Sequence, residues 1–331
     1  MKGELKDYRI LVTGAAGVLG LDLSRALLEQ GAQVVGLDLK GNGARFRKAV
    51  RGYAHAEFFS GNLLEPKSIE KALDVLQKGH KKTLAVYHLA GQGDANKCDT
   101  HPKEAFELNI TATGDLMEAC ARKGVRRVIF PSTAYVYGTS YDTLITEKFP
   151  VKPAGIYPLT KLTAEVIIQG YTEFAGMHCD IVRISNIYGP KSRPETILGT
   201  ILSQAERNKE IFLHCLWPVR DFIYVEDVIE ALVRLLKVRD AAGCRIFNLS
   251  TGEETSVGQL AELFCKVKGL PKAAVRCEEQ ASDKISQLVL SNQAISTYLR
   301  WKPKYDLKAG LRKTLEIRLG GEKSVNVKSG R

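Results

Sequence analysis

The chain has 331 residues, of which 44% are hydrophobic and 26% charged, with 48 basic and 37 acidic side chains and a formal net charge of +11. This is the composition of a globular protein, and the length corresponds to about two domains of roughly 150 residues. No apolar run reaches the roughly 18 residues of a membrane span, and the N-terminal MKGELKDYRI lacks the apolar core of a signal peptide. The basic runs are scattered and not interleaved with aromatic residues, so we expect neither a nucleic-acid nor a membrane partner.

The seven cysteines are odd in number and form no CxxC pair. This spacing argues against a disulfide scaffold and against a structural metal site. We therefore expect reduced thiols in a cytoplasmic protein, with no bound metal.

Apolar runs alternate with helical patterns through the first half of the chain. We expect strands at 9–13, 32–38, 57–62, 84–90 and 126–133, and helices at 18–31, 69–77 and 102–124. Continuous apolar strands separated by helices indicate a parallel sheet covered on both faces. The fold class predicted is therefore α/β, a doubly wound, Rossmann-like parallel sheet.

The second half is less regular. Helical patterns at 161–176 and 227–237 and apolar runs at 179–185 and 245–250 surround a stretch interrupted by Pro190, Pro194 and Pro218. We expect a nucleotide-binding domain over 1–185 that also receives about 220–250, and a smaller α/β substrate-binding domain over 186–219 and 251–318. Residues 319–331 are expected to form a polar, frayed tail.

A glycine-rich loop separates the first expected strand from the first expected helix. Its glycines, Gly14, Gly17 and Gly20, are spaced GxxGxxG. Such glycines allow a tight turn and a close backbone approach, so that the following helix N-terminus faces a pyrophosphate. Asp38, 18 residues after Gly20, ends the second expected strand. A carboxylate there hydrogen-bonds the adenosine ribose and repels a 2′-phosphate, which predicts NAD as the cofactor.

Tyr157 and Lys161 are four residues apart at the start of a helical pattern. This spacing places both side chains on one helical face, where the ammonium lowers the pKa of the phenol and makes it a usable acid and base. Ser132 and Thr133 lie at the carboxyl end of the fifth expected strand. Open α/β sheets bind ligands at such carboxyl ends.

At these motifs the sequence resembles the extended short-chain dehydrogenase/reductase family, specifically its NAD-dependent nucleotide-sugar epimerase/dehydratase group. The resemblance covers about residues 8 to 315. Its matches, in family order, are TGAAGVLG at 13–20, Asp38, HLAG at 88–91, Asn109, STAYVYG at 132–138, Tyr157 with Lys161, RISNIYGP at 183–190, RDFIYVEDV at 220–228 and FNLSTG at 247–252.

The resemblance implies a role for each matching residue. Asn62 stands where the family usually has an adenine-contacting Asp, and Ala90 and Gly91 line the cofactor. Tyr157 corresponds to the catalytic base, Lys161 to the residue that holds the nicotinamide ribose, and Thr133, with Ser132 beside it, to the hydroxyl on the reacting oxygen. Asn186 and Arg220 correspond to residues that bind the substrate diphosphate. The family also implies a homodimer through a four-helix bundle, here from helices near 103–123 and 157–175.

The two residues after Thr133 limit which reactions of the family the chain can catalyse. Family dehydratases carry an Asp-Glu pair where this chain has Ala134 and Tyr135, and neither of these residues takes a proton from carbon at neutral pH. Loss of water is therefore not expected, which leaves 4-epimerisation and ketone reduction. Family reductases often prefer the phosphorylated cofactor, whereas Asp38 favours NAD. We therefore expect a nucleotide-sugar 4-epimerase acting through a transient 4-keto intermediate, with an NAD(P)H-dependent reductase of a 4-keto-(6-deoxy)hexose nucleotide as the alternative. An NAD-binding regulator without catalysis is disfavoured, because such relatives lack the Tyr/Lys pair.

Two departures affect the substrate. The family's Gly-Asp-Gly turn before the Arg-Asp motif is replaced by 214–219, HCLWPV, and its later diphosphate-binding arginine is replaced around 279–283, EQASD. The sequence therefore leaves the sugar and its nucleotide open.

Overall fold

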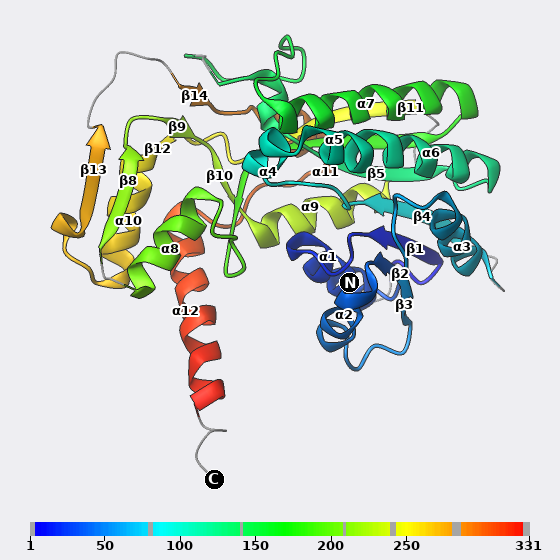
Figure 1. Ribbon diagram of the computed structural model, residues 1–331, viewed down its shortest axis with the longest axis horizontal. Helices are drawn as coiled ribbons and strands as arrows, with labels where there is room; N and C mark the ends of the chain where they lie inside the picture. The colour runs from blue at the N-terminus through cyan, green and yellow to red at the C-terminus, as the bar shows by residue number, and fades with distance from the viewer. Residues whose placement is uncertain are drawn as a thin grey trace. The chain divides into compact units, whose positions relative to one another are not determined.

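The computed structural model describes residues 4–78, 82–139, 142–207, 210–238, 243–279 and 286–326, the last eight of these by their backbone alone. The chain forms two compact units (Figure 1). The first comprises Met1–Gly138, Pro150–Ile184 and Ile229–Phe247, and the second comprises Thr139–Phe149, Ser185–Val228 and Asn248–Arg331.

The first unit is built on a seven-stranded sheet in the order β11-β6-β5-β4-β1-β2-β3. The five neighbouring pairs from β3 to β6 are parallel, which confirms the predicted Rossmann-like α/β fold. The strands are β1 (Tyr8–Thr13), β2 (Gln33–Asp38), β3 (Ala56–Ser60), β4 (Thr83–His88), β5 (Arg127–Thr133), β6 (His178–Ile184) and β11 (Gly243–Leu249).

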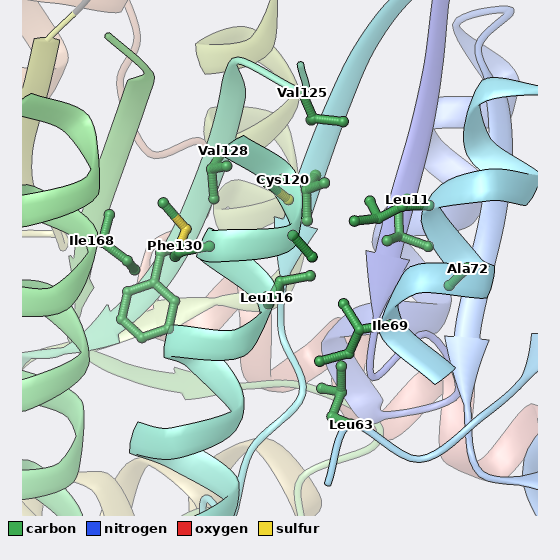
Figure 2. Packing of buried hydrophobic residues seen from close by; sticks show 14 of the residues in the cluster. Leu11, Leu63, Ile69, Ala72, Leu116, Cys120, Val125, Val128, Phe130 and Ile168 are labelled. Carbon is green, nitrogen blue, oxygen red and sulfur yellow. The ribbon is translucent and has the colours of Figure 1, made fainter. Parts of the chain in front are cut away.

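Helices cover this sheet because its central strands are apolar on both faces, as the burial of every residue of β1 shows. A core cluster joins β1, β2, β4, β5 and β6 to α3 (Pro66–Gln77), α6 (Ala112–Arg122) and α7 (Ile156–Ala175). Figure 2 shows Ile69, Leu116 and Ile168 of these helices turned toward Leu11, Val128 and Phe130 of the strands. Also in this unit are α1 (Val18–Glu29), η1 (Lys40–Asn42), α2 (Gly43–Ala49), α4 (Ala95–Thr100) and most of α9 (Val225–Lys237).

The helix predicted over 102–124 is not continuous. It consists of α5 (Pro102–Phe106), a π-helical turn, η2 (Glu107–Thr111), and α6. The wider turn buries Asn109 and allows its amide nitrogen to donate to the Gln92 carbonyl at 3.0 Å and to the Thr160 hydroxyl at 2.9 Å. Single π turns inside helices are frequent at functional sites.

The second unit contains short sheets that the sequence did not indicate. They are β7 (Asn186–Tyr188) with β10 (Phe222–Tyr224), β8 (Ile211–Cys215) with β13 (Val275–Glu279), and β9 (Val219–Arg220) between β12 (Thr255–Ser256) and β14 (Gln287–Leu288). The helices of the second unit are α8 (Ile197–Arg207), α10 (Val257–Lys268), η4 (Lys272–Ala274), α11 (Gln293–Leu299) and α12 (Leu307–Asn326). A further short helix, η3 (Ala134–Tyr137), directly follows β5 and belongs to the first unit.

Two boundaries differ from those expected. Residues Thr139–Phe149 lie in the second unit, because Ile145 donates to Val289 and accepts from Ser291 through the backbone, at 3.0 and 2.8 Å. The predicted frayed tail is wrong over 319–326, because the backbone of α12 stays helical to Asn326, even though Gly320 and Gly321 disfavour helix. Residues 327–331 lie outside the described part. Within the described residues, no helix is both long and apolar enough to cross a membrane. None of the seven cysteines, all of which lie in the described part of the chain, forms a disulfide.

Candidate active site

The glycine loop connects β1 to α1 as predicted. Gly14 has a φ of +65°, and a Cβ placed on it would lie 2.8 Å from the backbone nitrogen of Ala90. A Cβ on Gly20 would lie 2.2 Å from the Gly14 carbonyl oxygen. Only glycine permits these approaches. Gly17 precedes α1 without a side-chain cap, so the first amides of α1 are left for an anion.

Asp38 ends β2, and its carboxylate accepts three hydrogen bonds. The donors are the backbone nitrogens of Ala16 at 2.9 Å and Leu39 at 2.8 Å and the side-chain amide of Asn42 at 2.7 Å. Asp38 therefore ties the glycine loop to the turn after β2. Asn62 follows β3, and its side-chain oxygen accepts from the Leu64 nitrogen at 3.1 Å, which holds the turn where an adenine contact was expected.

A chain of buried hydrogen bonds links the glycine loop to the loop of Ala90 and Gly91. The Thr113 hydroxyl donates to the Asn109 carbonyl at 2.7 Å, so it accepts from His88 Nε2, 3.0 Å away. His88 Nδ1 then accepts from the Thr13 hydroxyl at 2.8 Å. Thr13 in turn accepts from the backbone nitrogens of Leu89 and Ala90. Burial lowers the pKa of His88 to about 3, so this imidazole is neutral with its proton on Nε2.

These residues fit a dinucleotide. The glycine cradle has no room for a Cβ, the helix N-terminus faces it without a side-chain cap, and a fixed carboxylate ends the next strand. This is the donor and acceptor set that a pyrophosphate and a ribose require.

Ser132 and Thr133 end β5 but differ in their partners. The Ser132 hydroxyl donates to the wholly buried carboxylate of Glu165. The Ser132 proton is therefore already used in a hydrogen bond within the protein. The Thr133 oxygen accepts from the Tyr135 nitrogen at 3.3 Å, which leaves its proton available to a ligand. Of the two hydroxyls, only that of Thr133 suits a substrate contact.

Helix α7 carries Tyr157 on its first turn and Lys161 one turn later. Asp99 of α4 caps this helix by accepting from the Ile156 nitrogen at 3.0 Å. The Thr160 hydroxyl donates to the Tyr157 carbonyl at 2.8 Å and accepts from Asn109. The turn that carries Tyr157 is therefore fixed from two sides.

Lys161 is half-buried, and its Nζ lies 3.8 Å from the ring centroid of Phe130. Burial lowers the pKa of its ammonium to about 7, and the Glu165 carboxylate opposes that shift. The ammonium therefore titrates near neutrality, unlike an ordinary lysine.

In the second unit, Asp221 holds Asn186. The backbone oxygen of Asp221 accepts from the nitrogen and the side-chain amide of Asn186, at 3.0 and 3.1 Å. Its carboxylate accepts from Ser185 at 3.0 Å, from the nitrogen and hydroxyl of Thr251 at 3.0 and 2.9 Å, and from Gly252 at 2.7 Å. Burial raises the pKa of Asp221 to about 6, against these hydrogen bonds.

Arg220 donates to the backbone oxygen of Ser286 at 2.7 Å and to its hydroxyl at 3.0 Å. The guanidinium is thus anchored to the start of β14. Residues 280–283, where the family's later arginine is missing, lie outside the described part of the chain. His214, in the other departure, is exposed and bonds Glu278 at 2.7 Å.

Three buried site residues were not assigned roles from the sequence: His88, Glu165 and Asp221. Their positions next to the matched motifs could have indicated them. His88 belongs to HLAG, Asp221 follows Arg220, and Glu165 lies four residues after Lys161. Among the residues that the structure describes, no cluster of three acidic, histidine or cysteine side chains could hold a metal.

Comparisons with known proteins identify similar sequences and structures over most of the chain. Residues 10–250 match the sequence model of the NAD dependent epimerase/dehydratase family. The chain is 30% identical over 316 residues to a UDP-glucose 4-epimerase of Mycolicibacterium smegmatis, covering 93% of this chain and 98% of that protein. It is 28% identical to a mouse dTDP-D-glucose 4,6-dehydratase, covering 93% and 88% of the two chains. A Thermus thermophilus UDP-glucose 4-epimerase solved with NAD superposes with a TM-score of 0.82 at 26% identity, over 94% of this chain and 99% of that one.

Proposed function

Because the chain belongs to the NAD dependent epimerase/dehydratase family, we propose that it is a nucleotide-sugar 4-epimerase that acts through a transient 4-keto sugar. The end of strand β5 at Thr133 supports an epimerase over a dehydratase. The next residue, Ala134, is buried and has no acid function, and the carboxylate bonded to Ser132 is that of Glu165, which is paired with Arg183 at 2.7 Å. This arrangement offers an alcohol-to-ketone step but no second acid and base for loss of water.

The proposed proton path uses Tyr157. NAD, when bound, supplies the acceptor and donor of hydride. The Tyr157 phenolate takes the proton of the sugar 4-hydroxyl and later returns it to the 4-keto oxygen. The Thr133 hydroxyl donates to that same oxygen, and the Lys161 ammonium stabilises the phenolate. Between the two proton transfers the keto sugar must present its opposite face.

The cofactor and the substrate are assigned to separate sets of residues. Gly14, Gly17 and Gly20 would hold the pyrophosphate of NAD and Asp38 its adenosine ribose, with Asn62, Ala90 and Gly91 lining the adenine and nicotinamide portions. Asn186 and Arg220 would bind the substrate diphosphate. Their support is the Asp221 hydrogen bonds that fix Asn186 and the Ser286 contacts that anchor Arg220.

A product assay without added cofactor tests the proposal. The purified protein is denatured to measure released NAD, and native protein is incubated with UDP-glucose, UDP-glucuronic acid and dTDP-glucose. We expect the C4 epimer of at least one of these sugars. A 4-keto-6-deoxy product would identify a dehydratase, and a stoichiometric requirement for NADH or NADPH would identify a reductase; either result contradicts the proposal.

We also propose a homodimer through α6 and α7. Three apolar side chains on α7 are exposed at spacings of seven and eight residues, Leu159 at 42%, Val166 at 61% and Phe174 at 85%. This spacing forms one helical stripe, and such a stripe marks an association surface. Sedimentation equilibrium should show a dimer for the native chain and a monomer for Phe174→Glu; a monomeric native chain would refute the assembly.

A further inference from the structure

A buried ion pair lies next to the strand end that carries Thr133. Arg183 of β6 donates through its terminal nitrogen to Glu165 of α7 at 2.7 Å and through Nε to both carboxylate oxygens at 3.2 Å. The remaining terminal nitrogen donates to the Tyr137 hydroxyl at 2.8 Å, and Ser132 donates to Glu165. Each charge of the pair is therefore hydrogen-bonded, as a buried ion pair requires.

Glu165 also lies one helical turn from a second cation, Lys161. It lies four residues after Lys161 on α7, which brings the two side chains onto one helical face about 5–6 Å apart at their Cβ atoms. Lys161 Nζ in turn lies over the Phe130 ring, a favourable cation–π position. Glu165 is thus shared between a permanent cation, Arg183, and one that titrates near neutrality.

The other described groups around Lys161 carry no fixed charge that would stabilise or destabilise its ammonium. Phe130 from β5 is apolar and stacks on His88 of β4, with ring centroids 5.6 Å apart. His88 is held neutral by burial. Tyr157 on α7 is the proposed proton carrier, and Tyr137 bonds Arg183. Among these described groups, Glu165 supplies the negative charge, and Arg183 is the cation bonded to it.

We propose that Glu165 is an electrostatic positioning residue, whose carboxylate neutralises Arg183 and sustains the ammonium form of Lys161. The proposal rests on the proposed function only in that the Lys161 charge serves Tyr157. Without the carboxylate, the uncompensated Arg183 charge would repel the Lys161 proton, so Lys161 would lose it at lower pH.

Direct titration of Lys161 provides the test. The protein, saturated with added NAD, is labelled with ¹³C-lysine, and the Cε signal of Lys161 is assigned by its absence in Lys161→Met. We expect Glu165→Gln to lower the Lys161 pKa by about 1 unit, the size expected for a charge within roughly 4–6 Å. Glu165→Asp, which keeps the charge, should leave the pKa closer to that of the native protein than Glu165→Gln does.

The double variant Glu165→Gln/Arg183→Met separates charge from packing. It removes both charges, so its Lys161 pKa should lie between those of the native protein and Glu165→Gln. A packing role predicts that two core changes perturb Lys161 at least as much as one. If Glu165→Gln fails to fold, the double variant alone must still show a Lys161 pKa below that of the native protein.

An unchanged Lys161 pKa in Glu165→Gln or in the double variant would overturn the inference. So would a Lys161 pKa in the double variant that is equal to or lower than the Lys161 pKa in Glu165→Gln. Because the readout is a lysine titration, it stands whether or not epimer is formed. Where epimer is formed, the alkaline limb of kcat should move to lower pH in Glu165→Gln by the shift that the titration measures.

Discussion

The two units hold their site residues in different ways. In the first, Thr13, Asp38, His88 and Thr133 all end parallel strands of one sheet, and short turns join them. In the second, Asn186 and Arg220 lie on strands of three and two residues. Asn186 is held by the backbone oxygen of Asp221 and Arg220 by Ser286. The buried carboxylate of Asp221 fixes that backbone through Ser185, Thr251 and Gly252. Under the proposed function, the cofactor and proton-transfer residues would therefore end strands of one continuous sheet, and the substrate residues would depend on a network that a few substitutions can alter.

If this division is right, variants of the first unit should change the chemical step or the cofactor, and variants of the second should change substrate binding. The largest effect is expected for Tyr157→Phe, which removes the proposed acid and base but keeps the ring. Epimer formation should fall about 10³-fold, within the range for loss of a general acid–base group. NAD released on denaturation should equal that of the native protein, because the glycine cradle and Asp38 are untouched.

A matched control exists on the same helix. Tyr171 of α7 is half-buried and packs edge-on against Phe174, so Tyr171→Phe removes a similar hydroxyl away from the proposed chemistry. Its activity should match the native value. Full activity in Tyr157→Phe, or an equal loss in both variants, would remove Tyr157 from the mechanism.

The second unit is tested by Asp221→Asn. The amide keeps one acceptor oxygen for four donors, so buried N–H and O–H groups lose partners, each at about 1–3 kcal/mol. We expect KM for the nucleotide sugar to rise about ten- to hundredfold, at about 1.4 kcal/mol per factor of ten, with NAD content unchanged. Ser185→Ala, which removes one of the four donors, should raise KM by less. A variant that loses NAD but keeps its KM would contradict the division between the units.

The same difference explains how much the sequence could predict. The sheet and the NAD-binding elements were predictable because glycine spacing, apolar strands and strand-end polar residues are local features. Short strands such as β9 were not, since two residues carry no periodicity and Val219 pairs with Ser256 and Gln287 far along the chain. The π turn was also missed, because it follows from the tertiary partners of Asn109.

Site roles show the same limit. Ser132 and Thr133 are equivalent by sequence position, and only the Glu165 contact separates the committed hydroxyl from the available one. That contact joins residues 33 positions apart, and no local sequence pattern around Ser132 predicts it.

A smaller effect is expected from Asp38→Asn. The neutral amide no longer repels a 2′-phosphate, and it accepts fewer of the three donors that reach Asp38. We expect affinity for NADH to fall about tenfold, the cost of roughly one charged hydrogen bond, and the preference over NADPH to shrink, as measured by fluorescence titration of cofactor-free protein. Asn42→Ala, which removes one donor but keeps the charge, should retain the preference. An unchanged preference in Asp38→Asn would exclude this carboxylate as its source.

The smallest effect at neutral pH is expected for His88→Gln, whose side chain can also donate to Thr113 and accept from Thr13. The native pKa of about 3 lies below the ordinary 6.5, so between these values the unfolded chain binds a proton that the folded chain does not. The stability from neutral His88 is therefore full above pH 6.5 and is lost as pH falls, at about 1.4 kcal/mol per pH unit. Denaturant titrations from pH 6.5 to 4 should show a slope shallower by about one proton in His88→Gln. Equal slopes for His88→Gln and native protein would mean that this histidine is not held neutral. That outcome would weaken the rigid, uncharged link between the glycine loop and the Ala90 loop on which the contrast with the second unit depends.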